Sequence, residues 1–345
     1  MKKKLLMAVF LILVMVSIEA AAEQKKGTLE VFGRPDLEAG TTKIEVLIWV
    51  LDINSINSAM QTFDANIFIR LVWKDPRLIH TGNGPVKYSL DKIWNPDCQI
   101  TNAGRLLRKT HPRTATVQPD GTVNYHQRYV GSFSQPLNLN DFPFDKQKLI
   151  LNLIAPEYTP EEIQFVPEKK MVAKGLPYAA GISKNISLPD WEILDFKTEN
   201  APYLILEGFE NAGYAFEFSA KRLSKYYLVK VILPLIFIVM MSWVVFWIDP
   251  ENLVTRIGAA ISSMLTLIAY RFDIDTLVPK VSYTTRMDEF IFMSTLLVFL
   301  SLIQAILTSS LAQSKKVSMA RKINFASRIV FPIIFFAFVF ITLFN

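Results

Sequence analysis

The chain has 345 residues, of which 51% are hydrophobic and 20% charged, and this composition excludes a disordered or collagen-like polymer. Its formal charge of +6, from 37 Lys and Arg against 31 Asp and Glu, would suggest a nucleic-acid partner only if the basic residues clustered on a soluble domain, and they do not. The single cysteine, Cys98, excludes an intrachain disulfide framework, and the three histidines, His80, His111 and His126, leave little material for a metal enzyme. The apolar excess indicates that part of the chain lies in lipid.

Residues 1–22 have the features of a secretory signal peptide. Lysines at positions 2–4 precede an apolar run from Leu5 to Ile18, and the alanines at 20–22 provide a small-residue cleavage site. The run is too short to span a bilayer, and a retained interfacial anchor is the alternative. Cleavage after Ala22 would leave the mature amino end outside the cytoplasm.

Residues 23–225 consist of short alternating runs separated by Pro, Gly and Asn turns, which predicts an antiparallel, immunoglobulin-like β-sandwich. The expected strands are Thr42–Val50, Ile67–Trp73, Val123–Gly131, Lys148–Leu153, Trp191–Lys197 and Ala215–Arg222. No phosphate-binding loop, G-x-S-x-G, H-E-x-x-H or paired-cysteine motif occurs, so nothing in the sequence supports an enzyme or a bound cofactor.

Residues 226–345 contain four long apolar segments that are expected to cross a membrane as a helical bundle. They run over 228–248, 253–276, 290–311 and 329–344, against the roughly 20 residues that a hydrocarbon core requires. The stretch 312–328 carries no acidic residue, so the positive-inside rule predicts a cytoplasmic loop there. Its basic residues are Lys315, Lys316, Arg321, Lys322 and Arg328. An external amino end followed by four spans agrees with that placement.

The second span is a poor lipid-facing helix because polar and charged residues interrupt it. Six of its residues, spaced by 3 or 4 positions, fall within an arc of about 80° at roughly 100° per residue. They are Gly258, Ser262, Leu265, Ala269, Phe272 and Thr276. This order of small, hydroxyl and bulky apolar groups is typical of a pore-lining helix, whereas an ordinary core helix predicts a larger apolar stripe without hydroxyls at its ends. Since one helix cannot enclose a pore, several copies must surround an axis.

The motif Phe142-Pro143-Phe144-Asp145-x-Gln147 resembles the core of the Cys-loop signature of pentameric ligand-gated ion channels. In that family two cysteines bracket the motif, but Gln135 and Leu149 stand at those positions, as in the prokaryotic members. The resemblance runs in order from about residue 30 to the end of the chain. Its other matches are Trp73-x-Asp75-x-Arg77-Leu78, Trp94-x-Pro96-Asp97, Arg222, Pro234 and Leu277-Val278-Pro279.

The resemblance implies a homopentamer around a central pore, with residues 23–225 as the ligand-binding domain. Leu265 and Phe272 would form apolar rings where water can dewet, and they are the proposed gates. The hydroxyls of Ser262 and Thr276 can replace lost ion hydration. Similarity over Ala269-Tyr270 and Tyr283-Thr284-Thr285 suggests an amine-responsive member rather than a proton-responsive one.

Two interpretations of charge selectivity remain open. Cation-selective relatives carry a Glu before the basic residue at the inner end of the second span, but here Thr255 precedes Arg256 and Ile257-Gly258 follow, as in anion channels. Against that, Glu251 and Asp273 lie near the stripe, while Arg256 projects about 160° away from it. Rings of carboxylates concentrate cations, so cation selectivity is favoured.

Family members bind agonists between neighbouring sandwiches, in an aromatic box where cation–π attraction holds an ammonium group. On this resemblance the ligand-binding residues are Phe68, Arg70, Gln99, Arg128, Tyr158, Tyr203, Phe209 and Tyr214. The box lacks an aromatic at Pro156, and the two arginines would equally suit a carboxylate.

The resemblance also implies a charged pair of Asp145 and Arg222 where sandwich and membrane domain meet. Coupling of ligand binding to the pore is expected to use this pair together with Phe142, Pro143, Phe144 and Pro279. The segments Asn54–Phe63 and Leu277–Tyr283 are expected to meet the motif there.

The sequence thus predicts a ligand-gated channel for monovalent cations in a bacterial inner membrane, with its amino-terminal domain in the periplasm. Its expected partners are membrane lipid and a small amine or carboxylate agonist, and no nucleic acid. Proton gating through carboxylates and histidines, anion selectivity and a non-conducting membrane-anchored sensor are the alternatives.

Overall fold

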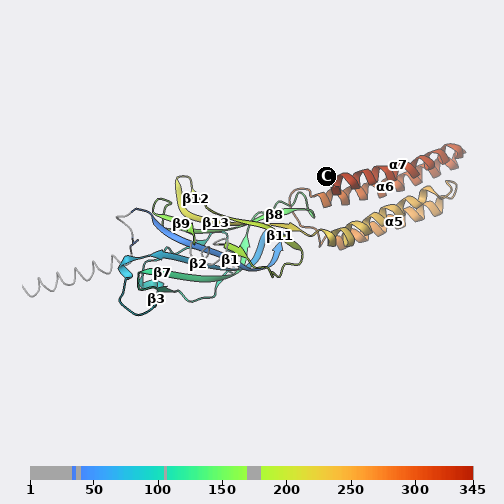
Figure 1. Ribbon diagram of the computed structural model, residues 1–345. Helices are drawn as coiled ribbons and strands as arrows, with labels where there is room; N and C mark the ends of the chain where they lie inside the picture. Colours follow the sequence, from blue (N-terminus) through green and yellow to red (C-terminus); the bar gives the residue numbers. More distant parts are fainter. Residues whose placement is uncertain (1–32, 36–39, 105–106, 169–179, 345) are drawn as a thin grey trace, which may run out of the picture.

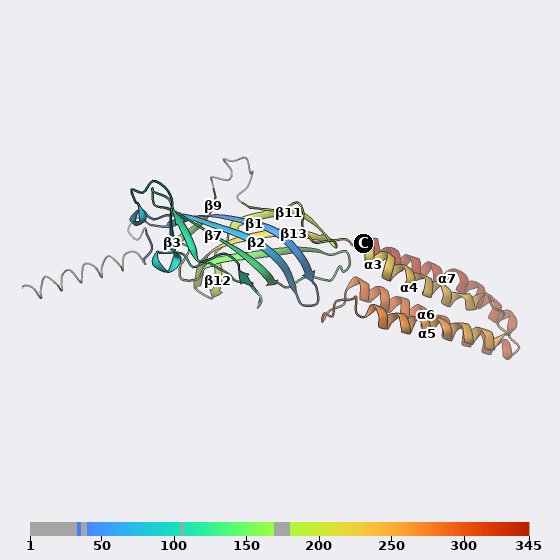
Figure 2. The ribbon, with the colours of Figure 1, turned by 90° about the horizontal axis from the view of Figure 1, so that it is seen from below.

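The computed structural model describes residues 33–35, 40–104, 107–168 and 180–344. The predicted signal peptide and its cleavage site lie outside these ranges. The molecule is elongated, with a β-sandwich at one end and a bundle of long helices at the other (Figures 1 and 2). This confirms the predicted fold class.

The larger sheet of the sandwich has eight strands in the order β10-β1-β2-β7-β6-β3, with β9 paired to β1 and β5 paired to β7. Its strands are β1 (Thr42–Asn57), β2 (Thr62–Lys74), β3 (Val86–Ser89), β5 (Arg108–Lys109), β6 (Thr114–Val117), β7 (Thr122–Ser134), β9 (Ile163–Pro167) and β10 (Ala180–Ile182). The pairs of β1 with β9 and β10 are parallel, and the others are antiparallel.

The smaller sheet has five strands in the order β11-β13-β8-β4, with β12 paired to β13. They are β4 (Gln99–Ile100), β8 (Lys146–Ala155), β11 (Trp191–Asn200), β12 (Tyr203–Leu206) and β13 (Phe209–Arg222). Aromatic rings pack between the two sheets. Phe63 of β2 stacks on Phe133 of β7 in the same sheet at 5.2 Å, and it meets Phe218 of β13 in the smaller sheet edge-on at 5.9 Å.

Each of the six predicted strands occurs, and each is longer than its apolar alternation indicated. In β1 the register to β2 shifts between Val50 and Asp52 and again between Ile53 and Ser55. Such bulges break the period of two, so the sequence pattern ends before the strand does.

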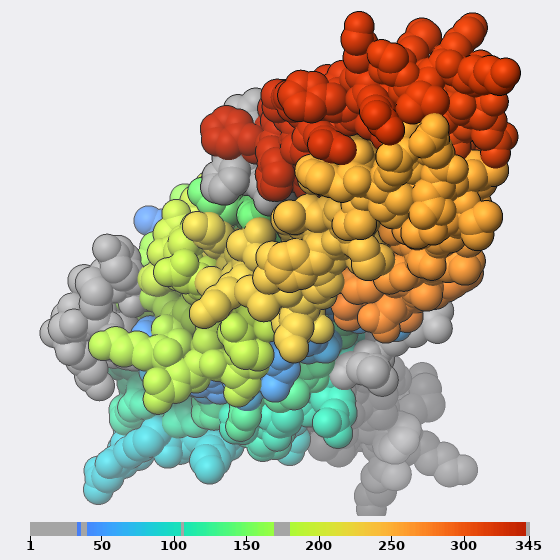
Figure 3. Space-filling model, turned by 90° about the vertical axis from the view of Figure 1, so that its right-hand side faces the viewer, coloured from blue at the N-terminus to red at the C-terminus, as the bar shows by residue number. Residues whose placement is uncertain are grey.

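Four helical spans follow, each long and apolar enough to cross a membrane. The first combines α3 (Lys225–Tyr227), a π-turn (Leu228–Ile232), α4 (Leu233–Ser242) and a 3₁₀ turn (Trp243–Phe246). The others are α5 (Leu253–Ile274), α6 (Arg286–Gln313) and α7 (Val317–Phe344). In the end-on view α7 (red) covers one side of the bundle (Figure 3).

The first span is irregular next to its proline. Pro234 has no N–H to donate to the carbonyl of Lys230, so the regular helical hydrogen bond is missing there. The hydroxyl of Tyr270 on α5 donates to the carbonyls of Lys230 and Val231, each at 3.0 Å. The second span is therefore bonded to the first at the point where the first is weakest.

The predicted loop at 312–328 is mostly helical in the structure. α6 ends at Gln313 and α7 begins at Val317, so only Ser314–Lys316 connect them, and Arg321, Lys322 and Arg328 lie on α7. The stretch contains no Gly or Pro to stop a helix. The prediction mistook the end of the apolar pattern for the end of the helix.

Candidate functional site

The helix α5 divides into a buried side and an exposed side. Arg256, Ala260, Ser263, Leu267 and Ile274 are buried against the rest of the bundle. The six residues of the predicted stripe are all exposed on the single chain, Leu265 by 61% and Phe272 by 76%. The face that the sequence assigned to a pore thus has no covering within one chain, and it lies opposite the face that packs.

Arg256 lies inside the bundle, and its hydrogen bonds among the described residues all go to neutral acceptors. Its guanidinium donates to the Val245 carbonyl at 3.2 Å, to Ser309 Oγ at 3.3 Å and to Asn324 Oδ1 at 2.9 Å. A weaker contact of 3.5 Å reaches Gln304 Oε1. These acceptors come from all three other spans, so the arginine fixes one end of α5 within the bundle and holds its charge away from the exposed stripe.

The carboxylates assigned to selectivity, Glu251 and Asp273, are both exposed near opposite ends of α5. Two neighbouring carboxylates are paired: Asp249 with Arg321 at 3.4 Å, and Asp275 with Lys280 at 3.1 Å.

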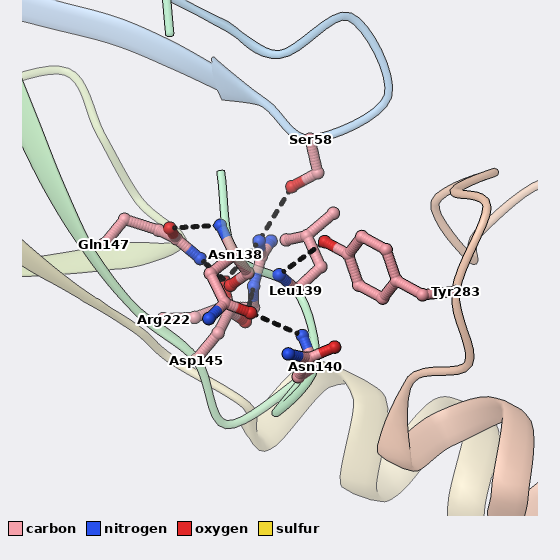
Figure 4. A network of polar contacts seen from close by, with 8 residues as sticks. All are labelled: Ser58, Asn138, Leu139, Asn140, Asp145, Gln147, Arg222 and Tyr283. Carbon is pink, nitrogen blue, oxygen red and sulfur yellow. Dashed lines mark hydrogen bonds and ion pairs between the residues drawn. The ribbon is translucent and has the colours of Figure 1, made fainter. Parts of the chain in front are cut away.

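The charged pair predicted at the junction of the two domains is present and buried. The Arg222 guanidinium donates to both carboxylate oxygens of Asp145, at 2.7 and 3.1 Å, and to Ser58 Oγ at 2.8 Å (Figure 4). The side chains are 6% and 1% exposed. Gln147 Nε2 donates to Oδ2 of the same carboxylate at 2.7 Å, so this oxygen accepts from both Gln147 and Arg222. The arginine is also covered by two rings, with its guanidinium carbon 4.9 Å from the centre of Phe142 and 4.2 Å from that of Trp191.

The loop that contains Phe142 to Phe144 is bonded directly to the start of α6. The backbone N–H of Arg286 donates to the Asn140 carbonyl at 2.9 Å, and that of Met287 donates to the Phe142 carbonyl at 3.2 Å. Phe142 and Pro143 are buried and Phe144 is half-buried. The loop and the start of α6 are therefore joined through two backbone hydrogen bonds.

The linker between α5 and α6 reaches the same loop. The Tyr283 hydroxyl accepts from the Leu139 N–H at 2.9 Å and donates to the Leu137 carbonyl at 3.3 Å (Figure 4). Pro279 is half-buried in this linker and lines, with Tyr283, a hollow of about 620 Å³. Sequence reasoning missed Arg286 here, and it placed Ser58 and Tyr283 at this junction only within the longer segments Asn54–Phe63 and Leu277–Tyr283.

On the larger sheet, β2 and β7 bring together Phe68 and Arg128, which are partners in the strand register. Phe68 stacks on His126 with 5.8 Å between ring centres, and His126 meets His111 edge-on at 5.2 Å. The Arg128 Nε–H donates to Asn66 Oδ1 at 2.8 Å. This face is half-buried and carries aromatic, imidazole and guanidinium groups.

Arg70 differs from Arg128 because a carboxylate already neutralises it. Its Nε donates to Glu168 Oε2 at 2.9 Å, and a second bond joins the same two groups. The Glu168 side chain is 2% exposed. Arg70 is therefore not free to bind a ligand carboxylate in this structure, contrary to the expectation. No pattern in the sequence indicated Glu168 as its partner.

On this face, His126 has a shifted pKa. Burial, together with the nearby positive charges of His111, Arg70 and Lys87, lowers its pKa below the ordinary value of 6.5. His126 therefore favours the neutral form in the fold.

The other predicted ligand residues lie around the smaller sheet. Gln99 of β4 and Phe209 of β13 are exposed, Phe209 by 71%, and Tyr203 of β12 is half-buried. Tyr158 is half-buried, and its hydroxyl accepts from Trp94 Nε1 at 2.8 Å. In the part of the chain that the structure describes, no hydrogen bond or ring contact joins these residues to Phe68 or Arg128.

The prediction that Tyr214 binds the ligand is wrong, because its side chain is buried. It is only 2% exposed and lies 6.5 Å from Phe165 inside the sandwich, so it cannot touch a ligand on the outer surface. Along β13 it has the same parity as Phe216 and Phe218, which are buried as well, and this alternation was the signal that could have placed it in the core.

Comparison with known proteins gives the same division of the chain. Residues 27–204 match the neurotransmitter-gated ion-channel ligand binding domain, and residues 231–322 match the neurotransmitter-gated ion-channel transmembrane region. A proton-gated ion channel of Gloeobacter violaceus is 28% identical over 293 residues, which are 84% of this chain and 79% of that one.

Two animal proteins are similar over the same regions. The human gamma-aminobutyric acid receptor subunit rho-2 is 28% identical over 284 residues, which are 79% of this chain and 58% of that one. The Caenorhabditis elegans acetylcholine-gated chloride channel subunit acc-1 is 25% identical over 276 residues, 76% and 57% of the two chains. Members of the family are channels rather than enzymes. With both family matches, a β-sandwich, four helices long and apolar enough to cross a membrane and a buried charge pair between them, the chain belongs to the neurotransmitter-gated ion-channel family.

Proposed function

We propose that this chain forms a homopentameric channel whose pore is lined by the exposed stripe of α5. The observation that carries the proposal is the mixed chemistry of that exposed face. Ser262 and Asp273 stand there beside Leu265 and Phe272, and such a face is poorly suited to lipid. In a ring of identical chains, water in the pore can solvate the polar side chains of this face, and the same face of the neighbouring chains can lie against its apolar side chains.

The agonist site lies between the β2–β7 face of one chain and the β12–β13 hairpin of its neighbour. Phe68, Tyr203 and Phe209 provide rings for an ammonium group, and Arg128, whose partner Asn66 is neutral, provides a positive charge for a carboxylate. The ligand is a small amine, a small carboxylate, or an amino acid that has both groups.

Permeant ions are monovalent cations. Exposed carboxylates at Glu251 and Asp273 support this, as does the burial of Arg256 away from the stripe. The channel resides in a bacterial inner membrane with its sandwich in the periplasm, because the basic residues at 315–328, among which no acidic residue stands, favour the cytoplasmic side.

Protons are the second candidate agonist. The cluster of Phe68, His111 and His126 lies on the face proposed for the ligand, and a similar bacterial protein is named a proton-gated ion channel. Protonation of His126 would add charge to an exposed position that already has Arg70 and Lys87 nearby.

The test is electrophysiology on the purified chain in planar bilayers, with a screen of amines, carboxylates and amino acids at neutral pH and a separate pH titration without ligand. Agonist-evoked current whose reversal follows the cation gradient supports the proposal. A reversal that follows chloride would overturn the selectivity, and current evoked by pH alone would favour protons. Absence of current under every condition would contradict channel function.

A further inference from the structure

Arg70 and Glu168 form a closed ion pair on the face of the larger sheet that is proposed for the agonist. The Arg70 Nε donates to Glu168 Oε2 at 2.9 Å, and a terminal guanidinium nitrogen donates to Oε1, so both carboxylate oxygens are used. The Arg70 side chain is 28% exposed and the Glu168 side chain 2%. The arginine thus borders the outer surface, while its partner is buried.

The backbone places Glu168 at the level of Arg70 in the sheet. Glu168 directly follows β9, which pairs with β1 in parallel, and its N–H donates to the Val46 carbonyl at 3.1 Å. Val46 and Pro167 are register partners, so Glu168 stands beside Leu47. Leu47 is in turn the register partner of Arg70 on β2. The carboxylate is therefore held with only β1 between it and the arginine, and it competes for the guanidinium at the high effective concentration of a group in the same chain.

The pair lies in line with the other groups of this face. Arg70 is the register partner of His126. Phe68, two residues earlier and hence on the same face of β2, is the partner of Arg128. A half-buried guanidinium without a counter-charge would repel an ammonium group nearby and attract a carboxylate. At Arg70 the carboxylate of Glu168 removes both effects.

We propose that Glu168 is a specificity-determining residue of the agonist site and that it selects amines without a carboxylate. By occupying the fork of Arg70, it denies a ligand carboxylate a bidentate partner, and by neutralising the charge it permits an ammonium group against the Phe68 ring. A ligand that displaced Glu168 would leave a buried carboxylate without its counter-charge, so this exchange is unfavourable. The inference rests on the proposed function, because it assigns the ligand class of that site.

The test compares two probes that differ only at one end, butylamine and gamma-aminobutyrate, in which a carboxylate takes the place of the methyl group. Their affinities for the purified full chain in nanodiscs are measured by isothermal titration calorimetry, which does not depend on current. The unchanged chain should bind butylamine more tightly than gamma-aminobutyrate.

In Glu168→Gln, the affinity for gamma-aminobutyrate should rise on the order of tenfold and that for butylamine should fall, because Arg70 then lacks its carboxylate. The matched control is Glu192→Gln, which removes an exposed carboxylate from β11 in the smaller sheet and should leave the ratio of the two affinities unchanged. Arg128 is present in every variant, so a carboxylate that bound only there would give one ratio throughout and would overturn the proposal.

The double variant Arg70→Gln, Glu168→Gln tests the same point without leaving a charge unpaired. If Arg70 holds no ligand in the unchanged chain, the double variant should keep the ratio of the unchanged chain. Selective loss of gamma-aminobutyrate binding there would mean that Arg70 holds the ligand carboxylate, and would overturn the proposal.

A purely structural pair would change both affinities equally in Glu168→Gln, and that result also contradicts a role in specificity. If neither probe binds the unchanged chain, this face is not an amine site and the inference fails. Channel function is decided separately, by the currents in the ligand and pH screen.

Discussion

Arg222 places a positive charge in an almost fully buried position between the two domains. The folded protein tolerates this charge because one carboxylate compensates it. Asp145 is the only acid among the described groups that bond it, and Ser58, Phe142 and Trp191 complete its surroundings. Removing one partner of such a pair leaves the other charge buried and uncompensated, which costs about 3–5 kcal/mol.

Asp145→Asn is therefore expected to lower the thermal unfolding midpoint of the purified protein strongly. The matched control is Arg286→Gln, because the pair of Arg286 with Asp141 is also at the junction but its side chains are 30% and 60% exposed. An exposed pair contributes about 0–1 kcal/mol, so this variant should unfold close to the unchanged protein. Equal midpoints for the two variants would refute the burial argument.

His126 should make the stability of the sandwich depend on pH. Its pKa in the fold is lower than the ordinary value of 6.5, so below that pH the unfolded chain binds more protons than the folded one. Stability attributable to His126 is complete above pH 6.5 and is lost as the pH falls toward the lowered pKa. The unfolding midpoint of the unchanged protein should drop between neutral pH and pH values below about 6.5, and His126→Gln should reduce that drop. His80→Gln, outside the cluster with Phe68 and His111, is the control and should leave the drop as it is.

At the scale of elements, α5 has one face buried in the bundle and an opposite, exposed face that is proposed to line the pore. Leu265→Ala shortens the apolar ring that excludes water from the proposed pore, so opening becomes easier. We expect current at roughly tenfold lower agonist concentration, or spontaneous current that is absent from the unchanged channel. Ile268→Ala removes similar apolar bulk from a 41% exposed position off the stripe and should shift the response much less. A rightward shift in Leu265→Ala would contradict the gate assignment.

Elements with a local pattern were predictable, and contacts between distant segments were not. Neighbouring residues carry the period of two in β2 and β7 and the spacing of 3 and 4 in α5. The strands and the exposed stripe could therefore be predicted from the sequence. The bonds of Arg222 to Ser58 and of Arg70 to Glu168 join residues 164 and 98 positions apart, and no local pattern carries them. The junction pair of Asp145 and Arg222 was predictable only through the resemblance of its motif.

At the scale of the whole molecule, a single chain is incomplete in two places. The α5 stripe is exposed at one end, and at the other the β12–β13 hairpin exposes Leu204, Leu206 and Phe209 by 58%, 66% and 71%. Apolar groups this exposed at a hairpin outside the membrane-spanning helices favour a neighbouring chain as their cover. The proposed closed ring of identical chains would cover the hairpin and enclose the stripe at the same time.

In such a ring each charge on α5 is repeated in every chain, so its direction decides ion selectivity. Glu251 and Asp273 are exposed, whereas Arg256 is 0% exposed and bonded to Val245, Ser309 and Asn324. Glu251→Gln and Asp273→Asn should each reduce the preference for cations, measured as a smaller reversal potential under a salt gradient, because the rings of negative charge are lost. Arg256→Gln should leave the reversal potential unchanged while lowering the unfolding midpoint, since its charge faces the bundle and not the ions. If Arg256→Gln instead moved the reversal potential while the carboxylate variants did not, the arginine would be the selectivity charge, and the bundle arrangement of α5 described here would not be that of the conducting channel.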